Sequence, residues 1–99
     1  MNKVMINTVY TQIYLAIEDF NQSVDYSEHL VKSPDTILYG KESGIGSLGL
    51  VTLLILIESK ITEHFKENID LVSEHSFKQE INPFSSIKNL AEYIIELLK

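Results

Sequence analysis

Cysteine and arginine are both absent from this 99-residue sequence, and each absence narrows what the protein can do. Without cysteine, disulfides, thiol catalysis and thiolate metal sites are excluded. The basic residues are all lysines, and 8 of them against 14 acidic residues leave a formal net charge of -6. No basic stripe is present to neutralise the phosphates of a nucleic acid, so we expect no nucleic-acid partner. An acidic surface favours attraction to basic partners.

Long apolar runs are also missing. The longest, residues 48–57, is interrupted by Gly49 and Thr52, whereas a membrane helix needs about 20 apolar residues. The first residues lack the apolar run of a signal peptide, so we expect a cytoplasmic protein without a membrane span. His29, His64 and His75 do not have the spacing of metal ligands, and we predict no metal site. The length is that of one domain, residues 1–99, which we expect to be monomeric.

Apolar residues recur at helical spacing in three segments. The first segment covers residues 3–21, the second runs from Ser47 to about Phe65, and the third begins at Ser85 or Ser86, each of which suits an N-cap. The predicted apolar faces are Ile6, Val9, Ile13, Ile17 and Phe20; Leu50, Leu53, Leu54, Ile57 and Ile61; and Ile87, Leu90, Ala91, Ile94 and Leu98.

The segments between these helices are rich in turn residues. Residues 22–46 predict a long loop, because Ser33-Pro34-Asp35 and the glycines after residue 39 break a helix. Ser73 is suited to cap a short helix through Lys78. No segment alternates as a strand does. The sequence therefore predicts an all-α fold, an antiparallel bundle of three main helices plus one short helix, with a long loop between the first and second helices.

The glycine-serine cluster before the second helix has three interpretations. Gly44, Gly46 and Gly49 match G-x-G-x-x-G, but a polar loop precedes them where a dinucleotide site needs a strand. The elbow of serine hydrolases, G-x-S-x-G, fails because residue 45 is isoleucine. In the third interpretation Ser47 is a covalent attachment site, since an exposed serine that begins a helix lies where the helix dipole favours a phosphate. Ser47 could also serve only as an N-cap.

The segment Gly44–Val51, with the sequence GIGSLGLV, resembles the phosphopantetheine attachment motif of acyl carrier proteins, whose common form is G-x-D-S-L. The resemblance extends to residues 35–38, similar to the family's loop ahead of the serine, and to residues 53–58 with Ile61, similar to its second helix. Residues 82–87 resemble the entry to the family's last helix, and residues 90–94 resemble the body of that helix. The resemblance covers residues 3–97 and is strongest in 35–61 and 81–95.

The resemblance implies a non-catalytic carrier of acyl or aminoacyl groups. A phosphopantetheinyl transferase would attach 4′-phosphopantetheine from coenzyme A to Ser47, which Gly46 and Leu48 flank. The thiol of this arm would hold the group as a thioester for acyl-transferring or synthase enzymes of a dedicated fatty-acid, polyketide or related biosynthetic pathway. The absence of cysteine fits, because the working thiol belongs to the cofactor. We expect no catalytic residue in the chain itself.

Two features depart from the family's pattern. Gly46 stands where the family has an aspartate that presents the serine to the transferase and its metal, and Glu42 could substitute only if the loop folds back. The outward face of the second helix is apolar where the family's is acidic, and exposed apolar patches mark interaction surfaces. Unless loop 22–46 covers it, this face is the expected partner-binding surface, formed by Leu48, Val51, Thr52, Ile55 and Glu58. The alternative that Gly46 leaves open is an unmodified helical protein-interaction module.

Overall fold

The computed structural model describes residues 3–40, 43–73, 76, 78 and 82–98. Its helices are α1 (Lys3–Gln22), α2 (Ser47–Phe65) and α4 (Ile87–Leu98), and a 3-10 turn, η1 (Tyr26–Glu28), lies between α1 and α2. No strand occurs within these described ranges, so the predicted all-α fold is confirmed. None of the helices in the described part of the chain is long and apolar enough to cross a membrane.

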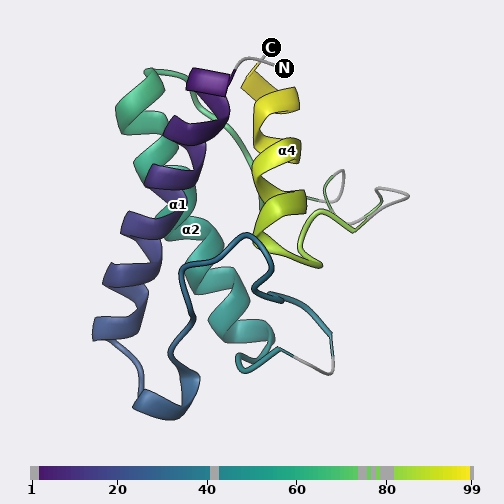
Figure 1. Ribbon diagram of the computed structural model, residues 1–99. Coiled ribbons are helices and arrows are strands. Elements are labelled where there is room, and N and C mark those ends of the chain that lie inside the picture. Colours follow the sequence, from purple (N-terminus) through teal and green to yellow (C-terminus); the bar gives the residue numbers. More distant parts are fainter. Residues whose placement is uncertain (1–2, 41–42, 74–75, 77, 79–81, 99) are drawn as a thin grey trace.

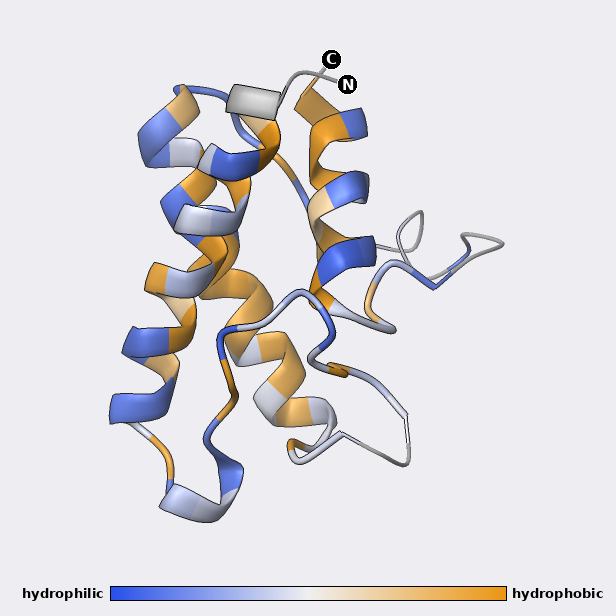
Figure 2. Ribbon diagram, viewed as in Figure 1, coloured by the Kyte–Doolittle hydropathy of each residue, from blue (hydrophilic) through white to orange (hydrophobic). Residues whose placement is uncertain are grey.

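Helix α1 packs against both α2 and α4. Figure 1 shows that α2 and α4 both run in the direction opposite to α1, so that the first turns of α1 and the last turn of α4 lie at the same end of the bundle. Because α2 and α4 are parallel to each other, the chain between them returns along the bundle. Hydrophobic residues lie mainly on the helix faces turned toward one another (Figure 2).

The core contains the faces that the helical spacing predicts. All five predicted residues of α2 and all five of α4 are buried, and in α1 only Ile6 of the predicted face is partly exposed. Each fully buried Leu, Ile or Phe side chain contributes about 1.5–3 kcal/mol. The spacing missed Tyr93 and Ile95, which are also buried. The Tyr93 hydroxyl is satisfied by the Ser76 hydroxyl at 2.8 Å, which explains how a tyrosine can lie in the core.

The start of α4 is capped by Ser86 and not by Ser85. The Ser86 Oγ accepts the backbone N–H of Asn89 at 3.1 Å, the bond that defines an N-cap. For the predicted short helix over residues 73–78, the structure places one cap bond, from the Ser76 N–H to the Ser73 Oγ at 3.2 Å. Residues 74, 75 and 77 lie outside the described residues, and so does that prediction.

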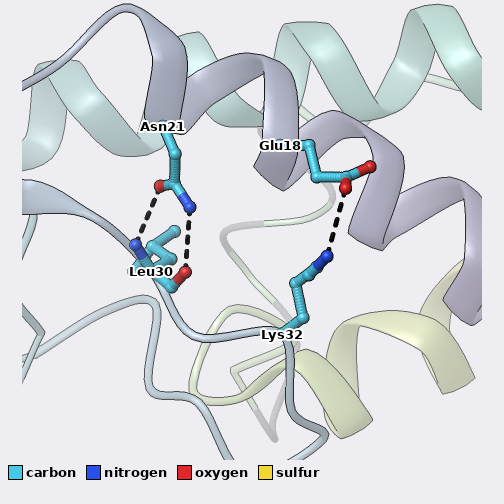
Figure 3. A network of polar contacts seen from close by, with 4 residues as sticks. All are labelled: Glu18, Asn21, Leu30 and Lys32. Carbon is cyan, nitrogen blue, oxygen red and sulfur yellow. Dashed lines mark hydrogen bonds and ion pairs between the residues drawn. The ribbon is translucent and has the colours of Figure 1, made fainter.

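The long loop between α1 and α2 is tied to α1 by side chains (Figure 3). The Asn21 amide donates to the Leu30 carbonyl at 3.0 Å and accepts the Leu30 N–H at 2.9 Å. Lys32 forms an ion pair with Glu18 at 3.1 Å. Leu30 itself is buried. These contacts hold the loop against α1 at residues 30 and 32. The 3-10 turn η1 belongs to this loop.

The same loop is also joined to α4. The N–H groups of Ile87 and Lys88 donate to the carbonyls of Thr36 and Pro34 at 3.0 and 2.9 Å. Leu38, the next buried residue of the loop, is only 1% exposed. The loop thus supplies acceptors for the first two N–H groups of α4 before it leads into α2. These bonds fix the position of loop residues 34–36 ahead of α2.

Candidate functional site

Helix α2 begins without a side-chain cap. Its N-cap is Gly46, with φ -83° and ψ -178°, and the Gly46 carbonyl accepts the Leu50 N–H at 2.9 Å. Ser47 is therefore the first helical residue and follows the N-cap, so the interpretation of Ser47 as an N-cap is wrong. The candidate hydroxyl stands on the first turn of α2 and is not used to close it.

The backbone beside Ser47 has unused hydrogen-bond donors. The N–H groups of Ser47, Leu48 and Gly49 have no acceptor among the described residues, as is usual for an uncapped first turn. The Ser47 side chain is exposed, and its hydroxyl forms no hydrogen bond with a described residue. These groups lie at the positive end of the helix dipole. The site thus combines a hydroxyl and three N–H donors that have no hydrogen-bond partner in the described part of the chain.

The two glycines on either side of Ser47 do different things. A Cβ added at Gly46 would meet nothing within 4 Å, so a ligand can approach the backbone there. A Cβ added at Gly49 would lie 3.2 Å from the Ile45 Cβ and 3.7 Å from the Phe20 ring. Glycine at 49 lets Ile45 fold back onto the helix, where it is only 8% exposed. This contact closes the turn that leads into Ser47.

Two hollows flank the start of α2. One, of about 320 Å³, is lined by Ser47 itself together with Leu38, Tyr39, Ile45 and Leu50. The other, of about 350 Å³, lies toward the end of α1. Glu28 and Tyr39 are the only titratable residues among the described linings of the two hollows. No histidine, the usual general base for a serine nucleophile, is among the described residues that line these two hollows.

The outward face of α2 is open. Leu48 is 81% exposed and Ile55 55% exposed, while Val51 is half-buried and Thr52 is exposed. The described part of the loop, residues 22–40 and 43–46, leaves Leu48 and Ile55 exposed, which answers for these residues the question that the sequence left open. We call Leu48, Val51, Thr52 and Ile55 the apolar patch. It begins next to Ser47 and runs along two turns of the helix.

Glu58 has a different environment from the one that the sequence suggested. It is half-buried, and its Oε2 accepts the N–H groups of Leu71 at 2.5 Å and Val72 at 3.4 Å. The carboxylate thus holds the segment that follows α2 against the helix. These contacts give Glu58 a structural role, which local spacing could not reveal because its partners lie 13 and 14 residues away. Glu42, considered as a substitute for the missing aspartate, lies outside the described residues.

One residue near the site was given no role from the sequence. The hydroxyl of Ser43 is bonded to the backbone on both sides of the turn before α2. A serine among glycines is an ordinary turn residue, so composition gives no signal that would separate it from the other serines.

No family model matches the chain, and neither a curated protein nor a solved structure matches it. The fold and the site define a small helical protein in which an exposed serine, without a hydrogen-bond partner among the described residues, lies at the start of α2 with an apolar patch beside it.

Proposed function

We propose that this protein is a carrier that holds acyl or aminoacyl groups as thioesters on a 4′-phosphopantetheine arm attached to Ser47. The observation that carries the proposal lies at the first turn of α2, where the Ser47 hydroxyl and three backbone N–H groups have no partner among the residues that the structure describes. The resemblance of Gly44–Val51 to the attachment motif of acyl carrier proteins supports the same assignment.

The residues at the start of α2 fit a phosphodiester. A phosphate on the Ser47 oxygen would lie at the positive end of the helix, where backbone N–H groups stabilise anions. Gly46 adds no side chain that would block it. The apolar side chains of Leu38, Ile45 and Leu50 line the adjacent hollow and offer a surface to the arm. When bound, the group supplies the thiol that forms the thioester, which the chain itself lacks.

The rest of the chain positions this serine and presents it to other proteins. The core holds α1, α2 and α4 together, and the loop fixes the approach to Ser47. The apolar patch would dock the phosphopantetheinyl transferase and then the acyl-transferring or synthase enzymes of a dedicated fatty-acid, polyketide or related pathway. Docking there buries apolar area that is exposed in the free protein. In this proposal the carrier performs no catalysis and acts as a cytoplasmic monomer.

A second candidate function follows from Gly46. The carboxylate that the family uses for recognition is missing at this position, while the apolar patch is present and open. An unmodified interaction module would use the patch alone and leave Ser47 free.

The experiment that separates the two uses the purified full chain with coenzyme A, magnesium and a broad-specificity phosphopantetheinyl transferase, followed by intact mass measurement. Ser47→Ala removes the acceptor. Ser59→Ala is the matched control, because Ser59 is also an exposed serine of α2. We expect one phosphopantetheinyl group on the wild type and on Ser59→Ala and none on Ser47→Ala. No gain with several transferases, together with none on protein from the native host, would favour the interaction module.

A further inference from the structure

Ser43 ties together two stretches of backbone just ahead of Ser47. Its hydroxyl lies 3.0 Å from the Leu38 carbonyl and 3.2 Å from the Ile45 carbonyl, either of which accepts its proton. The same oxygen accepts the Ile45 N–H at 3.2 Å. The Ser43 N–H donates to the Gly40 carbonyl at 3.1 Å. Ser43 thereby joins the backbone at residues 38–40 to the backbone at residue 45.

Both ends of this tie are anchored in the core. Leu38 is 1% exposed and Ile45 is 8% exposed. The residue after Ile45 is Gly46, whose carbonyl accepts the first hydrogen bond of α2. A displacement of Ile45 would therefore be passed to the start of the helix and to Ser47.

We infer that Ser43 is a positioning residue for Ser47, because its hydroxyl fixes the turn that determines where α2 begins. At α4 the cap residue Ser86 does this with its own side chain. At α2 the N-cap is a glycine, and the hydroxyl of Ser43 acts from three residues earlier. The bonds of Ser43 involve none of the first three N–H groups of α2, which have no acceptor within the described ranges of the chain. The consequence for modification rests on the proposed function, whereas the effect on the helix start does not.

The first test measures amide hydrogen exchange in the full chain without any modification. In Ser43→Ala we expect exchange at Leu50, the first bonded amide of α2, to rise about fivefold, the loss expected for one partly buried hydrogen bond. Exchange at Leu90 in α4 should not change. Ser43→Thr, which keeps the hydroxyl, should restore the protection, and Ser59→Ala should leave it unchanged. Unchanged exchange at Leu50, or an equal rise at Leu50 and Leu90, would overturn the inference.

The second test measures the kinetics of phosphopantetheine transfer. We expect Ser43→Ala to lower kcat about threefold to tenfold with KM unchanged. The apolar patch that binds the transferase stays intact, and only the Ser47 hydroxyl is misplaced. Ser43→Thr should recover most of the rate. A raised KM with unchanged kcat would assign Ser43 to docking and contradict the inference. If the wild type accepts no arm, the proposed function fails, and the exchange result still decides whether Ser43 fixes the start of α2.

Discussion

The starts of α4 and α2 are built in opposite ways. The first three N–H groups of α4 donate to the Thr36 carbonyl, the Pro34 carbonyl and the Ser86 hydroxyl. The first three N–H groups of α2 donate to no described residue. The start of α4 is thus closed by the loop and by a cap, while the start of α2 is left open.

The difference follows from where each start lies. Ile87, the first residue of α4, is completely buried, and a buried N–H without a partner is costly. Ser47, the first residue of α2, is exposed, so water can satisfy the donors there at little cost. The N–H groups at the start of α4 are hydrogen-bonded because this end of the helix packs into the core. At the start of α2 the donors and the Ser47 hydroxyl are left without a partner among the described residues, which is why we propose that the functional site lies there.

The largest contrast is expected between the apolar residues at the two starts. Phe84, just before α4, is fully buried, and Phe84→Ala should lower the free energy of unfolding by about 3–5 kcal/mol. Leu48, at the start of α2, is 81% exposed, and Leu48→Ala should change it by less than about 0.5 kcal/mol. Urea denaturation of both variants measures the difference. Comparable losses would show that the start of α2 is packed after all.

The next contrast is between the two serines. Ser86→Ala removes the cap of α4 and should lower the free energy of unfolding by about 1 kcal/mol, with Ser86→Thr retaining most of it. Ser47→Ala removes a hydroxyl without a described partner and should stay within about 0.5 kcal/mol of the wild type. Thermal and denaturant unfolding test this pair. A loss for Ser47→Ala as large as that for Ser86→Ala would mean that Ser47 is a structural residue.

A smaller effect is expected from giving α2 a cap. Residue 46 has space for a side chain and an extended backbone. Gly46→Asp and Gly46→Asn should each stabilise the protein by about 0.3 kcal/mol, since glycine is only slightly inferior as an N-cap. Only Gly46→Asp should also raise the rate of phosphopantetheine transfer, because the carboxylate is the feature that acyl carrier proteins use. Equal rates for the two variants would show that capping, and not charge, limits modification.

The smallest effect is a loss of stability at high pH, caused by the ionisation of Tyr10 and Tyr14 of α1. Burial raises the pKa of Tyr10 and of Tyr14 above the ordinary 10.0. The charges of Tyr14 and Glu92 raise the pKa of Tyr10 further, and the charge of Asp35, in the loop, adds a smaller increase for both tyrosines. Since the raised pKa favours the neutral form in the folded protein, this stability is fully present below pH 10.0 and is lost as the pH rises through the folded-state pKa values. Denaturation measured below and above this pH should show the fall. In the Tyr10→Phe, Tyr14→Phe double variant, the free energy of unfolding should fall less steeply with pH. An unchanged pH dependence would show that these two tyrosines do not cause the loss of stability.

The helices could be predicted from the sequence because their signal is local. The five core residues of α2, Leu50 to Ile61, share one face of one helix, and spacing alone identifies them. The predicted bounds of the second helix, Ser47 to about Phe65, agree with α2. Only the alternative in which Ser47 is the N-cap was wrong, because serine is the usual capping residue and glycine is less common there. The exposure of Leu48 and Ile55 was predicted only conditionally, since a long loop could have covered them.

The loop and its contacts could not be predicted, because they join residues far apart in the sequence. The bonds between Asn21 and Leu30 and between Thr36 and Ile87 depend on how the chain returns to the bundle. Glu58 was expected on an interaction surface, and its actual partners are backbone groups beyond the end of α2. Ser43 had no pattern to distinguish it, since its role depends on the two carbonyls that surround it.

The most direct test of the central claim is fragmentation mass spectrometry of the wild-type chain after treatment with coenzyme A, magnesium and a phosphopantetheinyl transferase. The account predicts a single phosphopantetheinyl group, located on Ser47. A chain that stays unmodified with several transferases, or a group located on any other residue, would contradict the claim that the open start of α2 is an attachment site.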